Sequence, residues 1–294
     1  MMTEAGSDPT AGYESRSTLE LVELVNAADS TVPEAVAAAT SAVAAVIDGI
    51  AERMRRGGRL LYVGAGSSGL IAALDASECE ATFGTPPGLV SALVAGGAGD
   101  TSLARAAAED NRDAGAADAG ALALVEADSV IGVTASGRTP YVLGAVEAAA
   151  ERGALTAGVV AAPDSPLAAL VDHEIAVLVG PEFIVGSTRM KAGTAQKLVL
   201  NAISTITMIR LGKTYGNLMV DVVAANEKLR DRVRQIVRSA TGASPEDVDE
   251  AIAAADGDAR VAIVSLLTGL DAPRARARLD ASGRSIAAAL ERPT

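Results

Sequence analysis

The segment YVGAGSSGLIAALDASECEATFG, residues 62–84, indicates most clearly what kind of fold this chain adopts. An apolar run ends in small residues and glycines, and a helical pattern follows at once. Such a strand–turn–helix unit is typical of parallel sheets, and free N–H groups at the helix start favour an anion. A second unit, GVTASGRTPYVLGA at residues 132–145, resembles the first. The two units predict an α/β fold in which both turns lie at the carboxyl edge of one sheet.

Strands and helices alternate around these two units. Apolar runs bounded by glycine or proline predict strands, and the segments between them have helical spacing. The predicted strands are RLLYVGAG (59–66), LVSALVAGG (89–97), SVIGVTASG (129–137), LTAGVVAAP (155–163) and HEIAVLVG (173–180). This alternation implies parallel pairing, so the predicted class is α/β: a doubly wound, mostly parallel sheet with N-terminal helices and a small helical C-terminal part.

Three regions follow from the pattern. They are an N-terminal arm at residues 1–17, an α/β domain with flanking helices at residues 18–240, and a helical subdomain at residues 241–294. Ser17 or Thr18 is expected to cap the first helix. One long helix is then expected from Thr31 to about Arg56, and only helices from Ser187 onward.

Composition narrows the functional class. The formal net charge of −12 disfavours nucleic-acid and anionic-membrane partners. A single cysteine, Cys79, and a single histidine, His173, form neither an internal disulfide nor a typical zinc site, and they favour a reducing cytoplasm. The N-terminus lacks a signal-peptide core, and Asp48 interrupts the most apolar early stretch. We therefore expect a cytoplasmic protein with no metal, no cofactor and no membrane partner.

The two turns carry hydroxyl groups suited to a phosphate: Ser67, Ser68, Thr134, Ser136 and Thr139. Their small neighbours let the backbone approach a ligand, and the helix dipole adds to the attraction. The alternative is that these hydroxyls only cap the following helices.

The glycines Gly64, Gly66 and Gly69 also fit G-x-G-x-x-G, a dinucleotide-binding pattern. That pattern expects an acidic residue at the end of the next strand, which here ends VAGG. The mismatch disfavours a nicotinamide cofactor.

Two carboxylates are candidates for acid–base chemistry. Glu78 lies ten residues after Ser68, about 15 Å along a continuous helix, so it reaches the turn only if that helix breaks early. Glu109, in AAAEDNRD, lies near another helix end. Two carboxyl groups in one cleft can divide the roles of acid and base. The alternative is that both are surface acids.

Basic residues gather at the head of an apolar helix near residue 190. Arg189, Lys191 and Lys197 oppose the helix dipole there. Contact with a ligand or a second subunit would explain them, and so would a buried ion pair with Glu182 or Asp221.

The chain resembles a known family at these same stretches. GRLLYVGAGSSG, LDASECEATFG, AEDNRDAG, ASGRTPYVLGA, GSTRMKAGTAQKLVLNAISTITMIRLGKTYGNLMVDV and ANEKLRDR together resemble the N-acetylmuramic acid 6-phosphate etherases of the sugar isomerase (SIS) domain superfamily. The resemblance runs from about Thr18 to the C-terminus, and the block at residues 186–232 is highly specific.

The resemblance implies a doubly wound SIS domain, a homodimer and a sugar-phosphate substrate. It implies cofactor-free cleavage of the D-lactyl ether of N-acetylmuramic acid 6-phosphate, giving N-acetylglucosamine 6-phosphate and D-lactate. It places the two catalytic glutamates at Glu78 and Glu109. The substrate-binding set that it implies, completed by two basic residues in the matching stretches, is Ser67, Ser68, Thr134, Ser136, Arg138, Thr139 and Lys191.

The chain also departs from the family pattern. Leu70 replaces an arginine, Ala161 and Ala162 replace Cys-Asn, Glu80 and Ala81 replace two prolines, and the N-terminal motif is reduced to TEAGSDP. Two other functions therefore stay open: a non-catalytic sugar-phosphate-binding regulator and an aldose–ketose sugar-phosphate isomerase.

Overall fold

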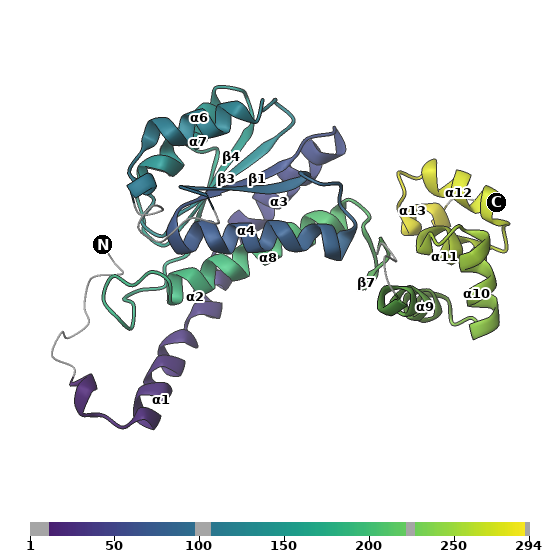
Figure 1. Cartoon of the computed structure of the whole chain (residues 1–294), viewed down its shortest axis with the longest axis horizontal. Coiled ribbons are helices and arrows are strands. Elements are labelled where there is room, and N and C mark those ends of the chain that lie inside the picture. Colours follow the sequence, from purple (N-terminus) through teal and green to yellow (C-terminus); the bar gives the residue numbers. More distant parts are fainter. Residues whose placement is uncertain (1–11, 98–106, 222–226, 292–294) are drawn as a thin grey trace. The chain divides into compact units, whose positions relative to one another are not determined.

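The computed structural model, which describes residues 12–97, 107–221 and 227–291, contains a five-stranded parallel sheet in its first compact unit (Figure 1). Its strands are β1 (Leu60–Gly64), β2 (Val90–Val94), β3 (Ser129–Val133), β4 (Leu155–Val160) and β5 (His173–Ala176). Their order is β2-β1-β3-β4-β5, and every pair is parallel. The predicted α/β class is therefore confirmed. Residues 1–11 of the predicted N-terminal arm lie outside the described residues, and so do residues 98–106, where a helix was predicted to start after β2.

The strand order reverses between β1 and β3, which places a crevice at their carboxyl ends. The chain leaves β1 for β2 on one side and later enters β3 on the other. Leu60 pairs with Ser129 and Gly64 with Val133, so the two strands end level. The two hydroxyl-bearing turns consequently start side by side.

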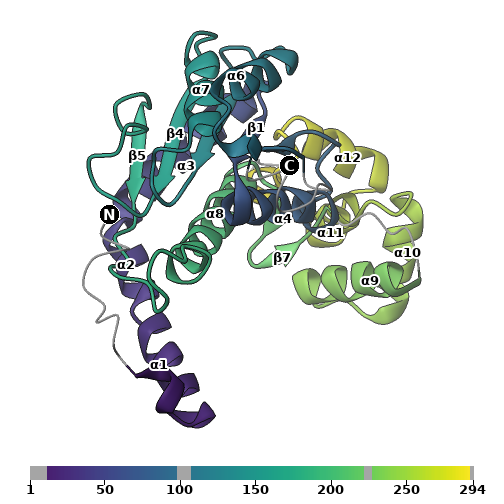
Figure 2. The same cartoon turned by 60° about the vertical axis from the view of Figure 1, so that its left-hand side comes forward.

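Helices cover both faces of the sheet (Figure 1). Helices α6 (Arg112–Ala121) and α7 (Pro140–Ala150) pack over one face, in a core that includes Leu61 and Val63. Since side chains alternate along a strand, Tyr62 points the other way, where its hydroxyl donates to Asp75 of α4 (Gly66–Phe83) at 3.0 Å. Asp75 also accepts from Ser204 of α8 (Lys191–Arg210) at 3.2 Å, so α4 and α8 lie side by side (Figure 2).

The N-terminal helices differ partly from the expectation. Helix α1 (Thr18–Asp29) is capped by Ser17, as predicted. The single helix expected from residue 31 to 56 is wrong, because α2 (Val32–Ala38) and α3 (Thr40–Arg55) are separated at Ala39. The backbone leaves the helical region there, at φ −96° and ψ 2°.

None of the described helices is by itself long and apolar enough to cross a membrane. One bent pair, Thr18–Ala38 with Thr40–Arg55, meets the length and composition test.

The chain divides into two compact units. Met1–Ser77 with Gly88–Thr205 forms the first, and Glu78–Pro87 with Ile206–Thr294 forms the second. The second unit contains a short antiparallel hairpin and five helices in its described residues: β6 (Thr214–Tyr215), β7 (Leu218–Met219), α9 (Glu227–Thr241), α10 (Pro245–Ala254), α11 (Ala259–Thr268), α12 (Ala272–Asp280) and α13 (Ile286–Glu291). The expectation of helices alone from residue 187 onward is thus wrong, and the boundary predicted at residue 240 falls at the end of α9.

Candidate active site

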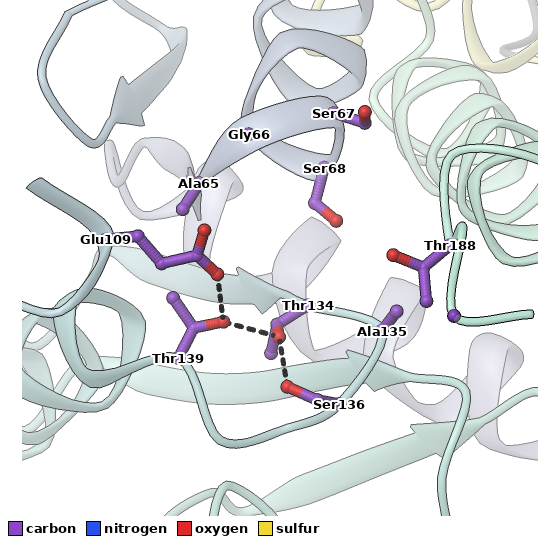
Figure 3. A pocket seen from close by; sticks show the side chains of 11 residues that line it. Ala65, Gly66, Ser67, Ser68, Glu109, Thr134, Ala135, Ser136, Thr139 and Thr188 are labelled. Carbon is purple, nitrogen blue, oxygen red and sulfur yellow. Dashed lines mark hydrogen bonds between the residues drawn. The ribbon is translucent and has the colours of Figure 1, made fainter. Parts of the chain in front are cut away.

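A cavity of about 210 Å³ lies in the first unit, at the carboxyl ends of β1 and β3 (Figure 3). The turn after β1, the turn after β3 and the segment before α8 contribute to it. The residues that line it are Ala65, Gly66, Ser67, Ser68, Glu109, Thr134, Ala135, Ser136, Thr139, Gly186 and Thr188. The structure thus brings both hydroxyl-bearing turns and one of the two candidate carboxylates to one place.

The first turn of α4 forms one wall of the cavity. Gly64 and Gly69 let the helix start press against the end of β1, since a Cβ on either would lie 2.8 Å from the backbone of the other. Gly66 has φ +53°, a backbone conformation that favours glycine. Helix–strand packing therefore accounts for the G-x-G-x-x-G spacing without a dinucleotide.

The start of α4 is suited to an anion. Its first turn contains no acidic residue, and Gly66, Ser67 and Ser68 all line the cavity. Unpaired N–H groups and the positive end of the helix dipole attract negative charge. In Figure 3 the Ser68 hydroxyl points toward the cavity, whereas the Ser67 hydroxyl points away from it.

A chain of hydroxyl groups runs along the second turn. Thr139 occupies the N-cap position of α7, but its side chain does not cap the helix. Its hydroxyl lies 2.9 Å from that of Thr134 and donates to Glu109 Oε1 at 3.2 Å. The Thr134 hydroxyl lies 3.4 Å from that of Ser136. The capping alternative therefore does not hold for Thr139, whose hydroxyl is directed to its neighbours in the cavity.

Glu109 supplies the charge of the site. It ends a helical turn at residues 107–109, and its half-buried carboxylate points toward Thr139 (Figure 3). Among the described residues that line the cavity, Glu109 alone carries an ionisable side chain. A bound anion would therefore be held by hydroxyl and backbone N–H groups rather than by a lysine or arginine.

Glu78 lies in the last turns of α4 and belongs to the second unit, whereas the residues that line the cavity belong to the first. Helix α4 continues unbroken to Phe83, so the early break that would fold Glu78 back is absent. The side chain is exposed and is not among the described residues that line the cavity. Four- and eight-residue spacing places it on the same face of α4 as Leu74 and Leu70, which are 47% and 40% exposed. Its catalytic role stays a prediction.

The two basic members of the predicted site do not line the cavity. Arg138 is exposed, and its backbone N–H donates to the Ser136 hydroxyl at 3.2 Å. Lys191 is buried, and its ammonium donates to the Val179 carbonyl at 2.6 Å. Both assignments as substrate ligands stay predictions.

Glu182 and Asp221, suggested from the sequence as ion-pair partners of the basic residues near position 190, bind other groups in the structure. Glu182 accepts from the backbone N–H groups of Lys191 and Ala192, at 2.9 and 3.0 Å, instead of pairing with an ammonium. Asp221 forms ion pairs with Lys213 and Arg260 in the second unit.

Two residues that line the cavity, Gly186 and Thr188, were not predicted from the sequence. The pattern at residues 187–190 predicted the start of a helix, whereas α8 begins only at Lys191. The glycine at position 186, with φ +76°, was the signal for a turn.

No group of three or more His, Cys, Asp or Glu side chains within the described residues is arranged to hold a metal ion.

Comparisons with known proteins extend this picture. A model described as the glucokinase regulatory protein N-terminal SIS domain matches residues 42–150, and the SIS domain model matches residues 108–206. The chain is 54% identical to the N-acetylmuramic acid 6-phosphate etherase of Streptomyces avermitilis, over 99% of this chain and 93% of that protein. The protein of the same name from Rubrobacter xylanophilus is also 54% identical, over 99% of this chain and 96% of that protein.

The chain belongs to the N-acetylmuramic acid 6-phosphate etherase family. A phosphoheptose isomerase from Francisella tularensis shares its fold with a TM-score of 0.53, at 22% identity, over 66% of this chain and 100% of the isomerase. At this identity the likeness concerns the fold alone. The resemblance seen in the sequence is thus confirmed at the level of the family.

Proposed function

We propose that this protein cleaves the D-lactyl ether of N-acetylmuramic acid 6-phosphate, without a cofactor, and releases D-lactate and N-acetylglucosamine 6-phosphate. One observation carries the proposal: Glu109 lies in a cavity whose other polar groups are hydroxyls and a helix start, in a chain that belongs to this family. A carboxylate beside an anion site provides a base next to a phosphorylated substrate.

The start of α4 and the hydroxyls of Ser68, Thr134 and Ser136 would hold the phosphate. Backbone N–H groups and the helix dipole suit a dianion even in a protein with a net charge of −12. The cavity, about 210 Å³, is smaller than the roughly 300–1,000 Å³ typical of small-molecule sites. It therefore suits the phosphate end of the sugar, with the remainder extending beyond it.

Glu109 would act as the base. Opening of the sugar ring gives an aldehyde at C1, which acidifies the hydrogen on C2. Glu109 removes that proton, the electron pair forms a C2–C3 double bond, and the C3–oxygen bond to lactate breaks. Addition of water then places a hydroxyl on C3 and a proton on C2. The hydrogen bond from Thr139 orients the Glu109 carboxylate for this transfer.

Glu78 would act as the acid that protonates the departing lactate oxygen, and we propose that it does so in a homodimer. Leu70 and Leu74 form an exposed apolar stripe on α4, and Glu78 continues the same face. Burying this stripe against a second copy removes apolar surface from water and carries Glu78 into the interface. The acid would then serve the cavity of the other chain.

The proposal is tested with purified protein and N-acetylmuramic acid 6-phosphate. Equal amounts of D-lactate and N-acetylglucosamine 6-phosphate are expected. Saturable binding without lactate would instead indicate a sugar-phosphate-binding regulator, and conversion of an aldose phosphate to a ketose phosphate an isomerase.

Light scattering tests the dimer: twice the 29.4 kDa chain mass is expected, and a monomer at micromolar concentration would contradict it. A cytoplasmic location and the exclusion of nucleic-acid and membrane partners remain predictions from composition.

A further inference from the structure

We propose that Glu182 is a positioning residue that holds Thr188 in the substrate cavity. It does so by fastening the loop at residues 181–190 to the first turn of α8. We call these contacts of Glu182 with the start of α8 the tether. The tether is formed without substrate, whereas its effect on turnover rests on the function proposed above.

Three consecutive backbone N–H groups at the start of α8 are bound by this loop. Glu182 Oε2 accepts from Lys191 at 2.9 Å, and Oε1 accepts from Ala192 at 3.0 Å. The carbonyl of Thr188 accepts from Gly193, also at 3.0 Å. Residues 182 and 188 are therefore tied to adjacent positions of one helical turn, and the segment between them is closed into a ring.

The contacts of Glu182 are what a buried carboxylate requires. The side chain is 1% exposed, so a charge at this position costs much free energy unless hydrogen bonds compensate it. The first N–H groups of a helix lack partners within the helix, and the positive end of its dipole favours a carboxylate. The hydrogen bonds therefore give the first N–H groups of α8 an acceptor and give the buried Glu182 carboxylate two donors.

Further contacts hold the loop on both sides of Glu182. The ammonium of Lys191 donates to the Val179 carbonyl, before the loop. The ring of Phe183, next to Glu182, stacks on Tyr13 with a centroid distance of 4.7 Å. Within the loop, Ser187 donates its backbone N–H to the Ile184 carbonyl at 2.9 Å. The loop is therefore ordered by specific bonds, and Glu182 is its charged anchor.

The tether ends in the cavity. Thr188 lines the cavity, and its hydroxyl points inward in Figure 3, on the side opposite Glu109. Since the Thr188 carbonyl accepts from Gly193, the backbone that carries this hydroxyl is held beside the cavity. The Thr188 hydroxyl would contact the substrate, and Glu182 would act through it.

A double-mutant cycle tests whether Glu182 affects substrate binding through Thr188. Glu182→Gln and Thr188→Val are each expected to raise KM for N-acetylmuramic acid 6-phosphate about tenfold, the loss of one hydrogen bond, with a smaller change in kcat. Because Glu182 acts through Thr188, the double variant should raise KM little beyond the larger single effect. Independent, multiplying effects on KM would overturn the proposal.

Asp128→Asn is the matched control. Asp128 is a buried carboxylate that also accepts from backbone N–H groups, those of Arg59 and Val125, at the amino ends of β1 and β3. Its loss should lower stability and leave KM unchanged. A rise in KM equal to that of Glu182→Gln would mean that Glu182 acts only through general stability.

Hydrogen exchange tests the tether without substrate. In the wild-type protein the amides of residues 191–193 are expected to exchange slowly, although the first turn of a helix usually exchanges fast. Glu182→Gln should accelerate exchange at residues 191 and 192, and Asp128→Asn should not.

Fast exchange of residues 191–193 in the wild type would overturn the tether even if Glu182→Gln did not fold. If the wild type released no lactate, the proposed function would fail, whereas exchange and the affinity for N-acetylglucosamine 6-phosphate would still decide the role of Glu182 and Thr188.

Discussion

Helices α4 and α8 both begin next to segments that line the cavity, but their first turns have opposite uses. The first turn of α4 lines the cavity with Gly66, Ser67 and Ser68 and contains no acidic residue. The first turn of α8 binds a carboxylate from its own chain, that of Glu182. The same N–H groups and dipole are present in both helices. The residues before the helix therefore decide whether its start is available for a ligand or serves to fix a loop.

The largest effect is expected at the carboxylate beside the start of α4. Glu109→Gln keeps the size of the side chain but removes the base, so D-lactate release should fall by about 10²–10⁴-fold. Binding of N-acetylglucosamine 6-phosphate, measured by calorimetry, should be retained. Glu147→Gln is the control, because the Glu147 side chain is about half exposed and, in the described structure, pairs with Arg112 outside the cavity. Activity of Glu109→Gln within a few-fold of the wild type would exclude Glu109 as the base.

The contact that places the start of α4 can be disrupted by one methyl group. In Gly69→Ala the added Cβ would lie 2.8 Å from the Gly64 carbonyl oxygen and 2.9 Å from a Val94 methyl. Relief of this overlap should lower the free energy of unfolding by about 1–3 kcal/mol and weaken substrate binding. Urea denaturation measures the first effect and KM the second.

Gly120→Ala is the same substitution in α6, where the added Cβ meets no atom within 4 Å. It should be neutral or stabilise the protein by about 0.4–1 kcal/mol. Equal losses of stability at positions 69 and 120 would contradict a close approach of α4 to β1.

A carboxylate bound to backbone N–H groups should also make stability depend on pH. Burial by itself would raise the pKa of Asp128, but hydrogen bonds from Arg59 and from the Val125 backbone outweigh it, and the pKa is lowered. The ionised Asp128 therefore stabilises the folded state above its unfolded pKa of about 3.9. This stabilisation is lost as the pH falls through the lower, folded pKa.

Asp128→Asn should remove about 1–2 kcal/mol at neutral pH, since it weakens hydrogen bonds to a charged group. Its free energy of unfolding should also fall less steeply than that of the wild type below about pH 4. Denaturation at a series of pH values measures both, and parallel curves for the two proteins would refute the assignment.

The smallest expected effect is a difference in ligand affinity between variants of two neighbouring serines of α4. Ser68→Ala removes a hydroxyl that points to the cavity and should weaken binding of the sugar phosphate by about 1 kcal/mol, roughly fivefold. Ser67→Ala removes one that points away and should change affinity less. The reverse order would show that the first turn of α4 presents a different group to the ligand.

The two turns of the cavity could be predicted because their signals are local. A buried strand, then small and hydroxyl residues, then a helical pattern are all contained in residues 62–84 and 132–145. The hairpin β6–β7 had a local signal too, since Gly216 and Asn217 separate Thr214–Tyr215, two residues common in strands, from the apolar pair Leu218–Met219. The break at Ala39 had none, because neither glycine nor proline marks it.

The start of α8 could not be predicted from local pattern. Thr188, Arg189 and Met190 are all acceptable in a helix, yet α8 begins at Lys191. The cause is a carboxylate nine residues earlier, at position 182, which binds the first N–H groups of the helix. Glu182 therefore supplies an anion from the chain itself to the backbone N–H groups of this helix start, while the Lys191 ammonium donates to the Val179 carbonyl.

A crystal structure of the Glu109→Gln variant with N-acetylmuramic acid 6-phosphate would show which groups hold the phosphate and which carbon faces residue 109. We predict the phosphate within hydrogen-bonding distance of the first-turn N–H groups of α4 and of the Ser68 and Thr134 hydroxyls, with C2 of the sugar facing residue 109. A phosphate bound away from the start of α4, or residue 109 turned away from the sugar, would contradict the account.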